Sequence, residues 1–217
     1  MPPTDRFVIS FAAEPPQEPL PYGRWADTLR EHFVAACNDI DSEGEELGQP
    51  GEIRWFPDRT FEGVTYVPAV ARTSVGYELF GYVSFTEGGE NGSGPDNFEA
   101  RADFTGDVAE QNPDWKLDLN EMVIGSWRGE AGNLAEMTLI WGQPLRPGGA
   151  TVTAELADLA VDQCELTEER FTLIAADNYR GDYLEIKLWG RRGELQATES
   201  LYVEDDGEGD DGEDQAS

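Results

Sequence analysis

The segment Asn97–Thr105, N-F-E-A-R-A-D-F-T, alternates apolar and polar residues without a break. Phe98, Ala100, Ala102 and Phe104 fall on every second position, and a charged residue stands in each gap between them. Successive side chains of a β-strand point to opposite faces of the sheet, so this period of two indicates a strand with one buried face and one wet face. The segment therefore predicts an antiparallel sheet that meets water on one side.

Runs of strand-forming residues recur on both sides of this segment, and stretches rich in Gly, Pro, Asn and Asp, which favour turns, separate them. Besides Asn97–Thr105 we expect strands at Arg6–Ala12, Ile53–Phe56, Val64–Ala71, Tyr77–Thr86, Met122–Arg128, Glu136–Trp141, Thr151–Leu156, Cys164–Ala175, Tyr183–Trp189 and Leu195–Val203. Many short strands at fairly regular spacing predict a mainly β protein, α+β by count, built as an antiparallel β-sandwich or a rolled sheet.

One amphipathic helix is predicted near the N-terminus, at about residues 24–41. Its apolar residues recur at steps of three and four, which places them in one buried stripe. The stripe consists of Trp25, Leu29, Phe33, Ala36, Cys37 and Ile40. The prolines of E-P-P-Q-E-P-L-P-Y-G, residues 14–23, exclude helix before it and predict an extended connection.

A chain of 217 residues with 39% hydrophobic composition can bury one substantial core. We therefore expect a single β-rich domain over residues 1–203. Residues 204–217 carry eight carboxylates and no cation, and we expect this acidic tail to be disordered because it has little apolar area to bury.

The charge balance extends beyond the tail. The chain has 45 acidic and 15 basic residues, a net charge of −30, and only Lys116 and Lys187 among the bases are lysine. Self-repulsion at this charge is relieved by concentrated salt, so the composition predicts a halophilic setting. A GC-rich genome that favours Arg codons is the alternative explanation.

This acidic surface repels phosphate groups, since affinity for nucleic acids and anionic membranes comes largely from Lys and Arg. We expect neither as a direct partner, and only loosely associated cations. No apolar run approaches the roughly 18 residues that cross a bilayer, and the N-terminus lacks a basic signal region. The expected location is cytoplasmic, or virion if the protein is viral.

Cys37 and Cys164 are the only cysteines, which is neither a disulfide framework nor a zinc site. They fit a reduced compartment, and one long-range disulfide remains an alternative. His32 has no second histidine for a metal pair, and we interpret it as a boundary residue of the helix rather than a general base.

The best local match to a chemical motif is D-I-D-S-E-G, residues 39–44. Asp39, Asp41, Glu43 and Gly44 occupy positions one, three, five and six of a helix-loop-helix calcium site. Position twelve should be a bidentate Glu and is Pro50, so we predict no metal site here.

Two further patterns suggest carbohydrate chemistry. A glycosidase needs two carboxylates about 5–10 Å apart, and four acids on expected strands are candidates: Glu78, Glu99, Asp103 and Glu185. Six tryptophans, at positions 25, 55, 115, 127, 141 and 189, include candidates for a sugar platform, although we expect most to fill the core. The tripeptides R-G-D (180–182) and N-G-S (91–93) are interpreted as a hairpin turn and a polar loop.

No catalytic, cofactor-binding or metal-binding residue is assigned, and no cofactor is expected. The favoured hypothesis is a non-enzymatic structural or assembly subunit of a halophilic system, such as a capsid, tail or connector component of a virion. Its expected partners are protein subunits, self or hetero, which dock on sheet edges and loops. The alternatives are a carbohydrate-active enzyme or lectin on a β-sandwich, and an acidic DNA mimic.

Overall fold

The computed structural model describes residues 25–42, 44–88, 94–129, 133–179 and 181–201. Four sequence expectations therefore lie outside the described residues: the strand Arg6–Ala12, the extended connection at residues 14–23, the N-G-S loop at residues 91–93 and the acidic tail at residues 204–217.

The described part of the chain is mainly β with one α-helix at its N-terminal side, as predicted. Helix α1 spans Ala26–Asn38, and η2 is a short 3₁₀ helix at Ala109–Gln111. The strands are β1 Pro50–Trp55, β2 Arg59–Phe61, β3 Val64–Thr73, β4 Glu78–Glu87, β5 Pro95–Thr105, β6 Leu117–Arg128, β7 Leu134–Pro144, β8 Gly149–Leu156, β9 Leu159–Glu165, β10 Phe171–Asp177, β11 Glu185–Gly190 and β12 Leu195–Ser200.

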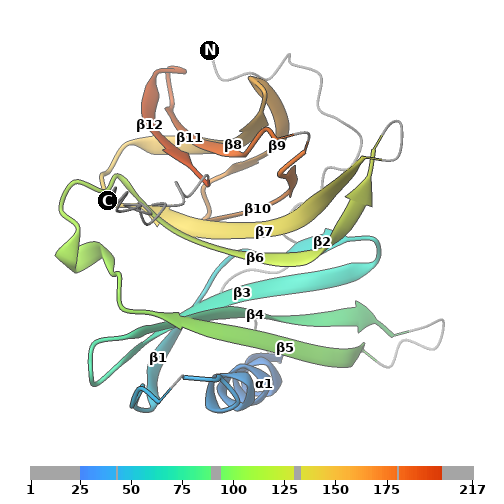
Figure 1. Cartoon of the computed structure of the whole chain (residues 1–217), viewed down its shortest axis with the longest axis vertical. Coiled ribbons are helices and arrows are strands. Elements are labelled where there is room, and N and C mark those ends of the chain that lie inside the picture. Colours follow the sequence, from blue (N-terminus) through green and yellow to red (C-terminus); the bar gives the residue numbers. More distant parts are fainter. Residues whose placement is uncertain (1–24, 43, 89–93, 130–132, 180, 202–217) are drawn as a thin grey trace, which may run out of the picture.

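The strands form three antiparallel sheets. A five-stranded sheet has the order β1-β3-β4-β5, with β2 also paired to β3; a three-stranded sheet has the order β10-β7-β6; and a four-stranded sheet has the order β12-β11-β8-β9. Figure 1 shows these sheets stacked in that sequence, with α1 on the outer face of the five-stranded sheet. The three-stranded sheet is therefore the middle layer.

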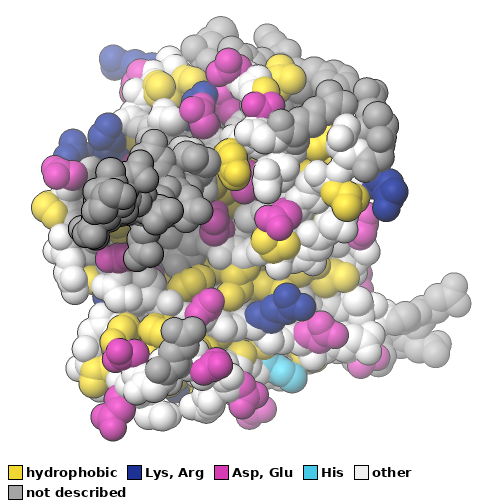
Figure 2. Space-filling model, in the orientation of Figure 1, with side chains coloured by type: hydrophobic (Ala, Val, Ile, Leu, Met, Phe, Trp, Pro, Cys, Tyr) yellow, Lys and Arg dark blue, Asp and Glu magenta, His cyan; other side chains and the backbone are white. Residues whose placement is uncertain are grey.

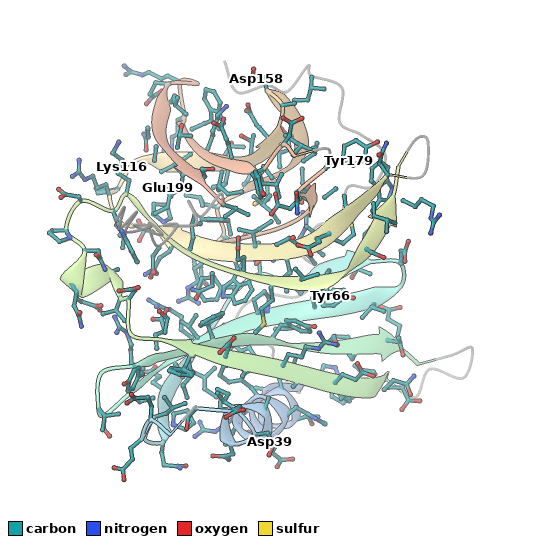
Figure 3. The ribbon with its side chains drawn as sticks, viewed as in Figure 1. Asp39, Tyr66, Lys116, Asp158, Tyr179 and Glu199 are labelled. Atoms are coloured by element: carbon teal, nitrogen blue, oxygen red, sulfur yellow. The ribbon has the colours of Figure 1, made fainter. Side chains whose placement is uncertain are left out.

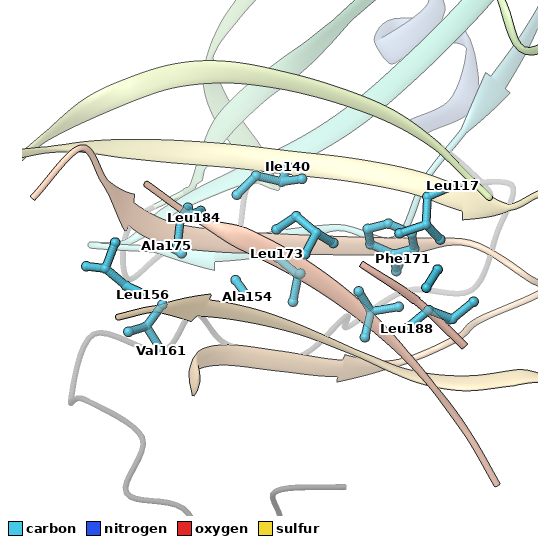
Figure 4. Close-up of a cluster of buried hydrophobic side chains, with 13 residues drawn as sticks. Leu117, Ile140, Ala154, Leu156, Val161, Phe171, Leu173, Ala175, Leu184 and Leu188 are labelled. Atoms are coloured by element: carbon cyan, nitrogen blue, oxygen red, sulfur yellow. The ribbon is translucent and has the colours of Figure 1, made fainter. Parts of the chain in front are cut away.

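The middle sheet contributes to a hydrophobic cluster on each of its faces. Met137, Leu139 and Trp141 of β7 belong to the cluster shared with the five-stranded sheet, toward which Tyr66 points from β3 (Figure 3). Ile140, between them in sequence, belongs to the cluster shared with the four-stranded sheet (Figure 4). Alternate side chains of one strand therefore supply two cores, which explains why β7 reads as an almost continuous apolar run rather than an alternating one.

The predicted helical stripe is confirmed except at Ala36, which is half-buried and outside the cluster. Leu29, Phe33 and Cys37 are buried against the five-stranded sheet, and Trp25 and Ile40 pack at the rim of the same cluster. The helix is shorter than the predicted 24–41, because it ends at Asn38. On β5, the predicted apolar face of Phe98, Ala100, Ala102 and Phe104 packs toward this helix-side cluster.

The expected strand Cys164–Ala175 is wrong, because a turn divides it between β9 and β10. Thr167 and Arg170 form an isolated bridge around Glu168 and Glu169, which both have positive φ. Two consecutive left-handed residues make the tight hairpin turn that matches strand twist, and Gly or Asn usually fills it. Two glutamates gave no such signal in the sequence. Strand β2 and most of β9 were likewise not predicted.

A single buried carboxylate joins all three sheets. Asp162 of β9 lies 2.6 Å from Nη2 of Arg59 of β2, and both residues are almost fully buried. The same carboxylate accepts the backbone N–H of Ile174 of β10 at 2.9 Å and that of Gln163 at 2.8 Å. Burial raises the pKa of Asp162, and Arg59 and the two backbone N–H groups oppose that rise. The four-, five- and three-stranded sheets therefore share one hydrogen-bonded anion.

Replacing Asp162 with Asn should lower the free energy of unfolding by about 3–5 kcal/mol, because it leaves the buried Arg59 charge without a counter-ion. Urea unfolding measures this loss. The double variant Arg59→Met, Asp162→Asn should lose less than the sum of the two single variants, since neither charge then remains unpaired. Strictly additive losses would contradict the assignment. The exposed variant Glu99→Gln is the control and should stay within about 0.5 kcal/mol of the wild type.

Candidate interaction edge and the polar junction beside it

Strand β6 forms one edge of the middle sheet. It pairs with β7 along its length, and among the described strands none pairs with its other side. The central part of this edge faces solvent: Val123 is 45% exposed, and Gly125 and Ser126 are also exposed. Unpaired N–H and C=O groups on an exposed edge are a template for a strand from another chain.

This edge is unusual in carrying no charge over Met122–Trp127, six consecutive residues in a chain of which 28% is charged. The other exposed edge strands all have shorter uncharged runs. On β5, for example, Glu99, Arg101 and Asp103 occupy alternate positions. Charged side chains on an edge strand discourage pairing with other chains. The only protecting device on β6 is a bulge at Ile124, where the register with β7 shifts.

Strand β10 ends the other side of the middle sheet and is also uncharged over Phe171–Ala176, but every residue of it is buried. Its edge is covered by β9, whose Asp162 accepts the N–H of Ile174. The two edges of the middle sheet therefore differ: one is sealed inside the protein and the other faces solvent.

A band of hydrophobic side chains accompanies the β6 edge. Figure 2 shows it crossing the molecule between the three-stranded and five-stranded sheets. Phe80, Met122 and Ile124 are among the partly buried residues of the cluster between these sheets. On β5 the side chains that point away from α1, including Glu99 and Asp103, remain exposed, so the middle sheet does not cover this outermost strand.

Glu121 lies at the start of the uncharged run. Partial desolvation of its carboxyl group raises its pKa to about 7 and the charges of Asp177 and Glu136 add to the rise, although the residue as a whole is exposed. The carboxyl group of Asp177 accepts the backbone N–H of Leu184 at 2.8 Å. Glu136 pairs with Ser126 across β7 and β6 and with Asp177 across β7 and β10, so these two acids lie toward the opposite end of the uncharged run from Glu121.

A second polar assembly connects the five-stranded and middle sheets at the first residues of β6. Nη2 of Arg54 lies 4.0 Å from Oε2 of Glu78 and 4.0 Å from Oδ2 of Asp118. These two carboxylate oxygens are therefore separated by at most twice the distance from each to Arg54. Arg72 contacts Glu78 at 3.2 Å, and Gln143 bridges by accepting from Arg54 and donating to Asp118. Burial first, and then Asp118, raises the pKa of Glu78, while Arg72, Arg54 and a hydrogen bond with Asn120 oppose that rise.

The glycosidase candidates are not brought together. Of the four nominated acids only Glu78 lies in this junction, and its acidic neighbour, Asp118, was not nominated. Glu99 and Asp103 are exposed on β5, and Glu185 pairs with Lys187 at 2.8 Å. Arg54 stands between Glu78 and Asp118, and together with Arg72 it balances their charge, which is the arrangement of an ion network between sheets.

The tryptophans are mainly structural. Trp141 and Trp55 are buried, and the other four are half-buried. Trp189 donates a 2.9 Å hydrogen bond to Thr153, and Trp127 packs edge-on against Tyr179. Trp115 lines a hollow of about 270 Å³ together with Glu110 and Asp118, and Trp55 lines the neighbouring hollow together with Glu52 and Glu110.

The calcium-type sequence does not form a loop with a closing ligand. Asp39 caps the C-terminus of α1, Gly44 has a positive φ, Glu43 lies outside the described residues and Pro50 begins β1. Within the described ranges no three His, Cys, Asp or Glu side chains converge as a metal site requires.

The remaining candidates also have structural surroundings. His32 stacks on Phe98 with ring centroids 5.1 Å apart. Tyr179 and Asp182 form the bridge of a turn around R-G-D, of which Arg180 is not described. Cys37 and Cys164 are free thiols, so the alternative of a disulfide between them does not hold, and burial raises the pKa of each to about 12.

The sequence matches no protein-family model, and neither a curated protein nor a solved structure matches the chain. In the described part of the chain, no helix has both the length and the apolar character that a bilayer span needs.

The raised pKa of Glu121 has a consequence for stability. An acid whose pKa is higher in the folded than in the unfolded protein destabilises the fold as it ionises, so stability should fall as pH rises from about 4.5, the ordinary pKa of Glu, to about 7. Glu121→Gln should therefore raise the melting temperature at about pH 8.5, and by less at about pH 5, where the folded wild type already holds this proton. A gain that does not depend on pH would contradict this explanation.

Proposed function

We propose that this protein is a non-enzymatic interaction or assembly subunit that accepts an extended strand of a protein partner on the free edge of β6. The observation that carries the proposal is the uncharged run Met122–Trp127, exposed at Val123, Gly125 and Ser126, on an edge strand of a strongly acidic chain. Strand addition uses backbone hydrogen bonds for affinity and alternate side chains for specificity.

The surroundings of β6 define the chemistry of this partner. A strand added there would lie over the part of β5 that the middle sheet leaves uncovered, next to Glu99 and Asp103. Its other contacts would be with the apolar band that includes Met122 and Ile124. The partner segment is therefore extended, with apolar residues alternating with basic ones.

The proposed setting is concentrated salt, in a cell or in the particle of a virus that infects a halophile. Exposed acids occur on every layer, including Glu31 on α1, Asp103 on β5 and Asp158 beyond β8. On the face in Figure 2 the acidic side chains are scattered rather than arranged in a row. A DNA mimic needs its carboxylates ordered on one face, so this distribution favours salt adaptation over mimicry.

The test is a selection of peptides from an unbiased library on the full chain in concentrated potassium chloride. The selected peptides should alternate apolar and basic residues. Val123→Lys should weaken their binding at least about tenfold, because Lys repels a basic strand and is a natural guard of edge strands. Titration calorimetry measures the affinities.

The matched control is Leu159→Lys, which places the same charge at an exposed apolar residue of a different edge strand, β9. This variant should bind the peptides as the wild type does. If both variants bind the peptides as well as the wild type does, or if both lose binding to the same extent, β6 is not the docking edge.

A further inference from the structure

Two hollows open on either side of one exposed ion pair. The larger, of about 590 Å³, is lined by residues that include Trp55, Arg54 and Arg170, and the smaller, of about 270 Å³, by residues that include Trp115 and Arg146. Arg72 and Glu110 form the ion pair and line both hollows. If Glu110 moved aside, the two hollows would become one groove, in the size range of small-molecule sites.

Four of the chain's 13 arginines line this groove, Arg54, Arg72, Arg146 and Arg170, and four acids line it beside them, Glu52, Glu110, Asp118 and Glu168. A guanidinium group has five N–H donors. Arg54 makes one hydrogen bond, to Gln143, and its Nε has no acceptor among the described residues. Arg170 makes one, to the backbone oxygen of Trp55 at 2.8 Å. Arg54 and Arg170 therefore keep N–H groups that could donate to a ligand, while Arg54 and Arg72 also form ion pairs with Glu78.

Glu110 shows that a carboxylate fits on Arg72. Its side chain is 75% exposed and belongs to the short η2 in the connection between β5 and β6. An exposed ion pair of this kind contributes at most about 1 kcal/mol, so an external anion can compete with it. The apolar wall beside it, formed by Ile53, Trp55 and Val70, suits the uncharged body of such a ligand.

We propose that this groove binds a small carboxylate- or phosphate-bearing molecule with an apolar body, whose anionic group replaces Glu110 on Arg72 and reaches Arg54 beside it. The site does not depend on strand addition at β6. It lies at the other end of that strand, where Asp118 enters the smaller hollow.

The test is titration calorimetry of the full chain with benzoate and with phenyl phosphate at constant ionic strength, and with neutral benzamide as the control ligand. Glu110→Gln removes the internal competitor and should strengthen binding by up to about fivefold. Arg72→Gln should weaken it by at least about tenfold, because charge-assisted hydrogen bonds are lost. Arg128→Gln, an exposed arginine outside the groove, should leave the affinity unchanged.

The site is supported if either anion binds most tightly to Glu110→Gln, less tightly to the wild type and least tightly to Arg72→Gln. The anion that binds better identifies the head group. Arg72 also pairs with buried Glu78, so circular dichroism must show that Arg72→Gln is folded. If that variant is unfolded, Glu110→Gln alone decides. Weaker binding to Glu110→Gln, equal binding of benzamide, or no binding of either anion to the wild type and to Glu110→Gln would overturn the proposal.

Discussion

The carboxylate of Asp162 is the point at which the three layers of sheet meet. It belongs to the four-stranded sheet, pairs with Arg59 of the five-stranded sheet and accepts a backbone N–H of the middle sheet. A buried charge is tolerated only when it is paired and hydrogen-bonded, so these three sheets must be held in one arrangement for the carboxylate to be satisfied. The ion pair therefore specifies how the layers stack, while the hydrophobic clusters on both faces of the middle sheet supply most of the stabilisation.

The same arrangement separates the two edges of the middle sheet. Asp162 and β9 cover β10, whereas β6 stays open to solvent beside an apolar band. Uncharged runs elsewhere in this acidic chain lie in strands that are paired on both sides or buried, as in β3, β4, β7 and β10. The uncharged run of β6 on an exposed edge is the exception, and it is this exception that leads to the proposed strand-accepting role.

Local patterns in the sequence predicted the mainly β class, the helical stripe around Phe33 and the apolar face of β5, because each depends on a short period. The turn at Glu168 and Glu169 was missed, since its left-handed residues are not the usual Gly or Asn. The stacking of three sheets was not predictable, because Arg59 and Asp162 are 103 residues apart and nothing local relates them. For the same reason Glu78 was nominated without its neighbour Asp118, and the edge position of β6 was not predicted.

Native-state hydrogen exchange of the backbone amides tests the central claim most directly, namely that one buried carboxylate unites three sheets and leaves β6 as the open edge. The amides of Ile174 and of the β7 strand should exchange only on global unfolding, together with those of β8 in the four-stranded sheet. The outward-facing amides of Met122–Ser126 should exchange far faster. If β6 proves as protected as β7 along its whole length, or if the four-stranded sheet opens independently of the middle sheet, the account is contradicted.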